Sequence, residues 1–247
     1  MTLPALPDLQ LTALRLPSAG PEPVPGEDAR DAVLGYVHGR RPLWFRPPGE
    51  RQGRWVQVPA FGWARFDDRP PAGTDDDGVL LAEGLHGRLD PAGWAEVRAA
   101  LERARPHADA AVARAGGRAF WELPEEELSV LGEPGTVGAA LRAIGEGPQP
   151  AYVSAALHHR SPTLVPHVDR TTWLQLVPHA REGDSGVHAV VHHELRANDA
   201  GFTALERALA DDGVALTRLR LHDVLVWLAG SLRTDTAVGM GRTRRAR

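Results

Sequence analysis

The stretch from Leu157 to Trp173, LHHRSPTLVPHVDRTTW, decides how this chain is expected to fold. It begins as the apolar end of a helix, continues through two prolines and delivers Asp169 just before a further run of helix-forming residues. The preceding residues, Ile144 to Gly147, form a glycine-punctuated turn of the kind that separates two helices. The pattern therefore predicts a helix, a tight hairpin, a second helix and a short proline-stiffened connection to Asp169.

Outward from this stretch, the sequence predicts a mainly α protein with a single helical domain over residues 27–235 and a helix-hairpin-helix-like centre. Asp90 and Pro91 pair an N-cap residue with proline at the first helical position, which is a strong start signal. Asp169 is likewise a candidate N-cap. Helices are expected over residues 27–38, 79–85, 90–103, 106–116, 124–131, 136–144, 150–159, 170–176, 185–196, 199–211 and 219–232.

The two ends and the region after the first helix have a different character. Residues 1–26 are rich in proline and are expected to form an extended arm on the surface. Residues 40–77 mix aromatic residues with proline and glycine, and the segment RWVQV favours a strand, so this region is irregular with a small hairpin or an ordered aromatic loop. The basic tail over 236–247 is expected to be disordered.

Composition narrows the classes of function. The 247 residues are 43% hydrophobic and 24% charged, as in an ordinary globular protein, and the net charge of −4 gives no overall attraction to nucleic acid. The absence of cysteine excludes disulfides, thiolate metal sites and cysteine nucleophiles. There is no apolar run of membrane-spanning length and no basic region before the first leucines, so we expect a cytoplasmic protein without a membrane partner.

Two separated segments carry a resemblance to a known family. The first holds Leu157, Arg160, Pro162, Leu164, Val165, Pro166, Asp169 and Arg170, and the second is the late helix LRLHDVLVWLAG around Asp223 and Trp227. In these features residues 79–232 resemble an uncharacterised actinobacterial family, a domain of unknown function. That resemblance implies a shared fold and names no activity.

A more distant resemblance connects the central motif with the helix-hairpin-helix DNA glycosylases. Gly145 and Gly147 match the hairpin glycines of that class, and Asp169 matches its aspartate. The resemblance implies that hairpin amides bind a DNA phosphate and that Arg160 and Arg170 add a basic face. It also implies that Asp169 lies beside a flipped base, where it activates water or stabilises a cationic sugar. DNA is then the expected partner, and no cofactor is expected.

Other residues near the hairpin argue for a purely structural alternative. Glu146 opposes a bound phosphate, and Pro148 and Pro150 remove amide donors that would bind one. No lysine follows the hairpin, so Schiff-base lyase chemistry is not expected. Asp169 is then simply the N-cap of the helix over 170–176, and the protein is a non-catalytic interaction module.

A third hypothesis is a small-molecule enzyme or binding protein that uses the histidine-rich region over 158–193. Seven of the eleven histidines lie there, and His188 and His192 stand four residues apart in an expected helix, as two metal ligands on one face would. The simpler interpretation favours no metal, because HAVVHHE is not a known zinc motif and no thiolate assists.

Two further features need an explanation from the fold. Asp223 lies within a leucine, valine and tryptophan run, so we expect it to be paired, with Arg160 or Arg170 as candidate partners. The aromatic residues near the N-terminus either stack on bases, line a small-molecule pocket or pin an irregular segment to the core. They are Trp44, Trp55, Phe61 and Trp63.

Overall fold

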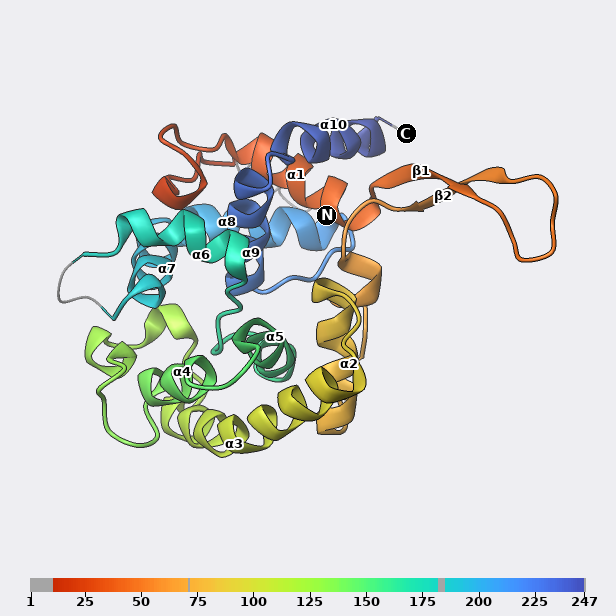
Figure 1. The fold of residues 1–247 in the computed structure, drawn as a ribbon. Helices are drawn as coiled ribbons and strands as arrows, with labels where there is room; N and C mark the ends of the chain where they lie inside the picture. The colour runs from red at the N-terminus through yellow and green to blue at the C-terminus, as the bar shows by residue number, and fades with distance from the viewer. Residues whose placement is uncertain (1–10, 71, 182–184, 247) are drawn as a thin grey trace, which may run out of the picture.

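The helices pack in two groups, one above the other in the view of Figure 1. The computed structural model describes residues 11–70, 72–181 and 185–246. The lower group contains α2 (Asp75–His86), α3 (Pro91–Ala115), α4 (Val137–Gly145) and α5 (Pro150–Arg160). The upper group contains α1 (Gly26–His38), α6 (Arg170–Leu176), α7 (Val187–Ala197), α8 (Asp199–Asp211), α9 (Arg218–Gly230) and α10 (Thr234–Arg245). The prediction of a mainly α protein is confirmed.

Helix starts have local causes that the sequence displays. The Asp90 carboxylate accepts a hydrogen bond from the Gly93 amide at 2.7 Å, and Thr74 forms a reciprocal capping box with Asp77 at the start of α2. Asp169 caps α6 in the same way, through the Thr172 amide at 2.8 Å. The predicted cap at Asp169 is therefore confirmed.

The stretch from Leu157 to Trp173 connects the two groups of helices. It leaves the lower group at the end of α5, and it enters the upper group at the start of α6 (Figure 1). Leu164 and Val165 are buried along the way, and the Thr217 hydroxyl donates to the Pro162 carbonyl at 2.8 Å. The connection is therefore held by the core and by α9, which it reaches through Thr217, the N-cap of that helix.

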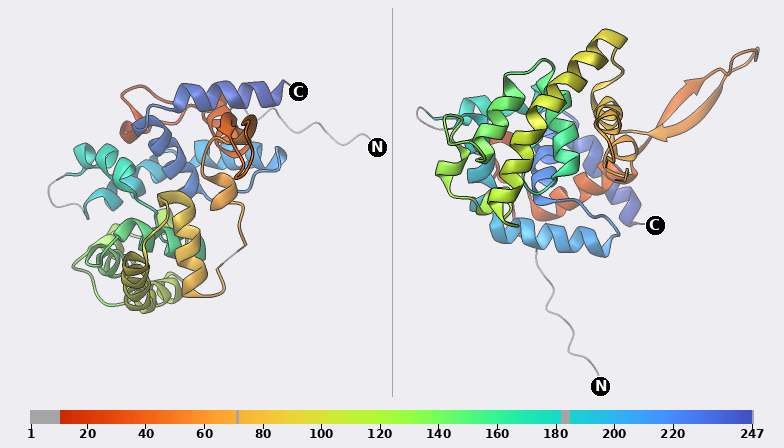
Figure 2. Two further views of the ribbon diagram at one scale, coloured as in Figure 1. Left: turned by 45° about the vertical axis from the view of Figure 1, so that its right-hand side comes forward. Right: turned by 90° about the horizontal axis from the view of Figure 1, so that it is seen from below.

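The C-terminal tail differs from expectation, because residues 234–245 form α10 instead of a disordered segment. This helix lies along α1 (Figure 2), and the two backbones approach closely at Gly35 and Gly241. Arg245 also pairs with the buried Asp31 at 2.6 Å. Packing and ion pairing therefore order a sequence whose own helix propensity is weak.

Other elements also differ from the boundaries predicted from the sequence. Pro106 lies inside α3 instead of starting a new helix, and residues 125–128 form only a short 3₁₀ helix. Residues 11–25 are not a surface arm: Leu14 and Leu16 are buried, and Leu14 forms an isolated bridge with Val24. The first ten residues of the expected arm lie outside the described residues. In the part of the chain that is described, no helix has the length and apolar character needed to cross a bilayer.

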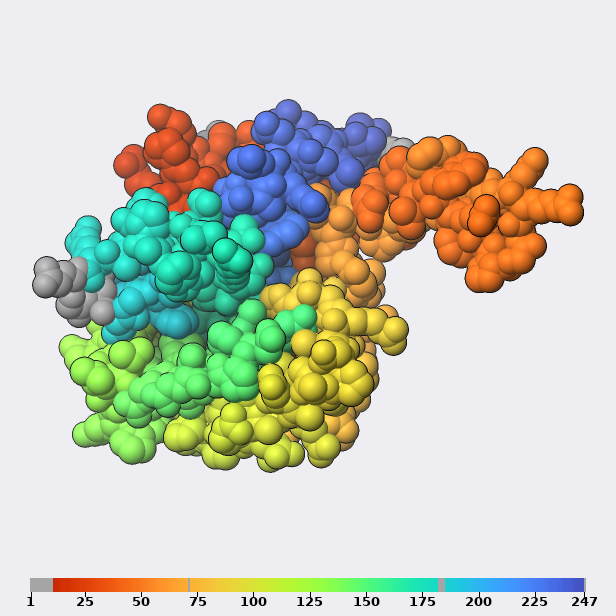
Figure 3. Space-filling view, viewed as in Figure 1, coloured from red at the N-terminus to blue at the C-terminus, as the bar shows by residue number. Residues whose placement is uncertain are grey.

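The expected short strands form one antiparallel hairpin, β1 (Arg40–Phe45) and β2 (Arg54–Pro59). This hairpin stands away from the helical body in the right-hand view of Figure 2 and in Figure 3. Its base leads directly into residues 60–69, where Phe66 packs against α2 and α5, and Asp67 bonds Tyr36 of α1 and Arg220 of α9.

Candidate functional site: a cavity beside Asp169

A cavity of about 150 Å³ lies where the two groups of helices meet, and it has an apolar wall and a polar wall. Its elements are α1, the 60–65 loop, the end of α2, the 167–169 connection and α9. The apolar lining residues are Ala60, Phe61, Leu85, Val224 and Trp227, and the polar ones are Tyr36, Arg65, His86, His167, Asp169, Arg220, Asp223 and Arg233. The site is therefore built from segments that are distant in sequence.

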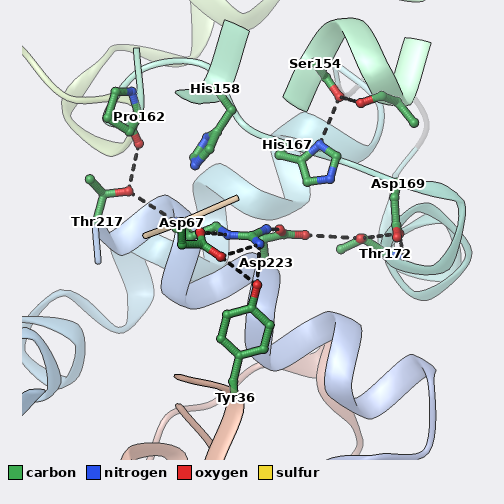
Figure 4. Close-up of polar contacts among 12 residues, drawn as sticks. Tyr36, Asp67, Ser154, His158, Pro162, His167, Asp169, Thr172, Thr217 and Asp223 are labelled. Carbon is green, nitrogen blue, oxygen red and sulfur yellow. Dashed lines mark hydrogen bonds and ion pairs between the residues drawn. The ribbon is translucent and has the colours of Figure 1, made fainter. Parts of the chain in front are cut away.

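Arg220 is the centre of the polar wall, and its partners Tyr36, Asp67 and Asp223 lie together in Figure 4. Its guanidinium donates to Asp67 at 2.7 Å and to the Tyr36 hydroxyl at 2.8 Å, and it pairs with Asp223 one helical turn away. The ring of Phe66 lies 5.1 Å from the guanidinium carbon. The neighbouring carboxylates raise the pKa of Arg220 against a large opposing effect of burial, so this cation stays charged.

Asp223 holds a proton more readily than an ordinary carboxyl group. Burial raises its pKa to about 6, although the Arg220 charge opposes that rise. Thr172 Oγ1 lies 3.2 Å from Asp223 and 2.7 Å from Asp169, yet a hydroxyl has only one proton to donate. When Asp223 is protonated it donates to Thr172, and Thr172 donates to Asp169. The three groups thus form a hydrogen-bonded chain from α9 to the cavity.

Asp169 is half-buried and uses only one oxygen in capping α6. Its Oδ1 accepts from both the amide and the hydroxyl of Thr172, at 2.8 and 2.7 Å. Its Oδ2 has no hydrogen-bond partner among the described residues. Because Asp169 lines the cavity, a ligand there meets a carboxylate that the helix start already holds in position.

Two neutral histidines complete the polar wall. Burial lowers the pKa of both His86 and His167, and their rings lie 5.2 Å apart. His167 Nδ1 contacts Ser154 Oγ at 3.1 Å, and Ser154 donates to the Ala151 carbonyl, so Nδ1 is then the donor and Nε2 an acceptor. His86 Nε2 is buried without a hydrogen-bond partner in the described part of the molecule.

The cavity has two cationic side chains that are exposed. Arg65 and Arg233 both line it, and neither forms an ion pair within the described ranges. Arg233 lies over the Trp227 ring, with its guanidinium carbon 5.7 Å from the centroid. A negatively charged substituent on a ligand would therefore be favoured where these arginines reach solvent.

The other residues implied by the glycosylase resemblance do not join Asp169 in this cavity. Gly145 is the last residue of α4, and Gly147 packs against α3 through Ala100. Arg160 pairs with Asp109 at 3.2 Å, and Arg170 is exposed. The left-handed backbone of the turn is taken by Gln149, with φ of 52°, so neither glycine is required there for a positive φ.

The alternative metal site at His188 and His192 gains no third ligand from the residues that the structure describes. His192 Nε2 donates to the Leu123 carbonyl at 2.8 Å, which removes that nitrogen from coordination. Burial lowers the pKa of His188 to about 4. Across residues 11–70, 72–181 and 185–246, no three histidine or acidic side chains converge as metal ligands.

The expected pairing of Asp223 is confirmed, with a different partner. Its cation is Arg220, not Arg160 or Arg170. The spacing of three residues within one helix is a signal that identifies this pair from sequence alone. Tyr36, Asp67 and His86 were not predicted, because only the tertiary fold brings them to α9.

Comparison with family models, with curated proteins and with solved structures finds no match to this chain. The geometry of the cavity is therefore the basis for its interpretation.

Proposed function

We propose that the cavity beside Asp169 binds a single planar ring that carries hydrogen-bond donors. The observation that carries the proposal is that Asp169 Oδ2 and His86 Nε2 have no hydrogen-bond partner among the described residues, and that the rings of Phe61 and Trp227 line the same cavity. An engineered protein cavity of about 150 Å³ holds benzene, so this volume suits one ring. A few polar groups on an apolar wall are the usual composition of a small-molecule site.

The charges favour a particular class of ring. Arg220 is already shared between Asp67 and Asp223, so Asp169 leaves the inner lining with an excess of negative charge. That excess favours a neutral or cationic heterocycle whose N–H groups point at Asp169. Arg65 and Arg233 favour an anionic substituent at the exposed side. A pyrimidine-like heterocycle with a phosphate or carboxylate substituent meets both requirements.

Calorimetric titration with cytosine, uracil and their nucleoside monophosphates tests this function. We expect saturable binding of at least one ring, tighter with the phosphate present, and a loss of roughly tenfold or more in Asp169→Asn, because removing one charged acceptor costs about 1.5 to 3 kcal/mol. Asp90→Asn is the matched control, since Asp90 is also a capping aspartate but is remote from the cavity. Equal binding by wild type and Asp169→Asn would overturn the proposal.

A second candidate function is nucleobase excision, in which the ring is a base flipped out of nucleic acid. The exposed Arg65 and Arg233 favour it, because they would contact the phosphates on either side of that base. Asp169 would accept a proton from water as the water oxygen bonds to C1′ of the sugar. The N-glycosidic bond would break and the base would leave with its electron pair and take up a proton.

Release of free base from oligonucleotides that carry damaged or mismatched pyrimidines tests the second candidate. Wild type should leave abasic sites and Asp169→Asn should not, whereas Asp90→Asn should match wild type. Ring binding without base release would retain the first function and reject the second.

A further inference from the structure

The β1–β2 hairpin is an exposed arm whose strands pair only with each other among the residues that the structure describes. Its two strands pair with each other, from Arg40 opposite Pro59 to Phe45 opposite Arg54, and the ribbon extends beyond the helical body (Figures 2 and 3). Trp44 and Trp55 are directly opposite each other, with ring centroids 5.4 Å apart. They remain 54% and 67% exposed, which is unusual for two tryptophans in contact.

The pairing register places different side chains on the two faces of the arm. Because neighbouring residues of a strand point to opposite faces, Trp44 and Trp55 share one face with Arg40. Leu43 and Phe45 share the other with Arg41 and Arg54, and they too are exposed. Each face therefore combines exposed apolar or aromatic surface with arginine.

The arm is strongly basic in a chain that is acidic overall. Residues 40–59 contain five arginines and one glutamate, a net charge of +4, whereas the whole chain carries −4. All five arginines are exposed, and none has an ion-pair partner in the part of the chain that the structure describes. They are Arg40, Arg41, Arg46, Arg51 and Arg54. Positive charge on this segment is thus available to an external anion.

We propose that this arm binds single-stranded nucleic acid, with phosphates on the arginines and bases stacked on Trp44 and Trp55. Arginine is the cation best suited to phosphate, because its guanidinium donates two parallel hydrogen bonds. Exposed aromatic rings beside a basic track are the elements that bind unpaired bases without sequence preference. A duplex offers such rings no free base faces.

The arm favours this partner over a membrane or a second copy of the chain. Its tip, from Arg46 to Arg54, has the sequence RPPGERQGR, which is too polar to enter a bilayer. Two copies placed arm to arm would bring ten arginines together, which like-charge repulsion opposes. Phosphate charge, by contrast, complements the arm along its whole length.

The arm also connects physically with the cavity. Pro59, its last residue, is followed at once by Ala60, Phe61 and Gly62, all of which line the cavity. A strand bound along the arm would therefore run toward the Asp169 site. The proposal goes beyond ring binding and does not depend on it, because no residue of the arm lines that cavity.

Fluorescence anisotropy of labelled oligothymidylate tests the arm. Trp44→Ala/Trp55→Ala should weaken binding about tenfold or more, since each stacked base is worth roughly 1 to 3 kcal/mol. Arg46 and Arg51 lie between the paired strands, so Arg46→Glu/Arg51→Glu should leave the strand pairing intact. This variant should weaken binding. It should also lower the slope of the logarithm of the binding constant against the logarithm of salt concentration by about 1.4, at roughly 0.7 for each phosphate contact. Arg103→Glu/Arg207→Glu changes the net charge equally at exposed sites on α3 and α8, and should bind as wild type does.

Several outcomes would overturn the proposal. The first is no binding of oligothymidylate at low salt, and the second is an equal loss of affinity in the arm variants and in the control variant. The third is tighter binding of duplex than of single strand, with no effect of Trp44→Ala/Trp55→Ala. The fourth is binding to phosphatidylserine vesicles and not to oligothymidylate. Asp169→Asn separates the two proposals: it should lose ring binding and keep oligothymidylate binding. Circular dichroism and melting temperature verify that the arm variants keep the helical body folded.

Discussion

Arg220 is the residue on which the centre of the molecule depends most. It is buried with Asp67 and Asp223, so its removal would leave two buried carboxylates without their cation. Removing one partner of such a buried network typically costs about 3 to 5 kcal/mol. We therefore expect Arg220→Met to lower the free energy of unfolding in urea by that amount.

Arg103→Met provides the control for this measurement, because Arg103 is exposed on α3 and its replacement should change stability by less than about 0.5 kcal/mol. If Arg220→Met also changed the free energy of unfolding by less than about 0.5 kcal/mol, the network would be incidental to folding. Arg220→Met/Asp223→Leu/Asp67→Leu should recover part of the loss, since apolar groups of similar volume replace buried charges at little cost.

At the scale of residues, the sequence was informative where partners are close along the chain. Asp169 could be predicted as a cap because the bonded amide is three residues away, at Thr172. The need of Asp223 for a partner followed from its apolar neighbours. Tyr36 and His86 could not be assigned to the site, because α1 and α2 reach it only after the whole chain has folded.

At the scale of elements, the contact between α1 and α10 depends on glycine. A Cβ at Gly241 would collide with the backbone carbonyl of Asp31, whereas a Cβ at Gly239 in the same helix would meet nothing within 4 Å. Gly241→Ala should therefore destabilise the protein by about 1 to 3 kcal/mol, as an overpacked interface does.

Gly239→Ala is the matched control for that substitution. It should be neutral or stabilising by up to about 1 kcal/mol, because alanine has the higher helix propensity. Thermal unfolding of both variants, followed by circular dichroism, makes the comparison. Similar losses in both would mean that α10 is limited by helix formation and not by its packing on α1.

The same contact explains why the tail was predicted wrongly. The sequence TDTAVGMGRTRR has two glycines and little apolar periodicity, so its local signals indicate disorder. What stabilises α10 is a close backbone approach at Gly35 and Gly241 and pairing of Arg245 with Asp31, and none of these is a local property. By contrast, the start of α3 was predictable, since Asp90 and Pro91 act within one turn.

At the scale of the whole molecule, buried histidines dominate the response to acid. Burial lowers the pKa of His158 and His188 to about 4, and that of His167 well below its ordinary value of 6.5. A histidine with a lowered pKa in the folded state contributes stability above pH 6.5, and that contribution is lost as the pH falls toward 4. Asp223 acts in the opposite direction, since its pKa is raised to about 6, but it is one group against several histidines, because burial also lowers the pKa of His38, His86 and His192.

Stability should therefore fall as the pH is lowered from 6.5 to 4. At pH 4.5, a histidine with a pKa of about 4 has lost roughly 2.5 kcal/mol of its contribution. His158→Gln should remove about that much of the difference in unfolding free energy between pH 7 and pH 4.5, whatever it does to stability at pH 7. Exposed His107→Gln should leave the difference unchanged, because His107 meets water in both states. If His158→Gln retained the full acid sensitivity, protonation of His158 could not contribute to it.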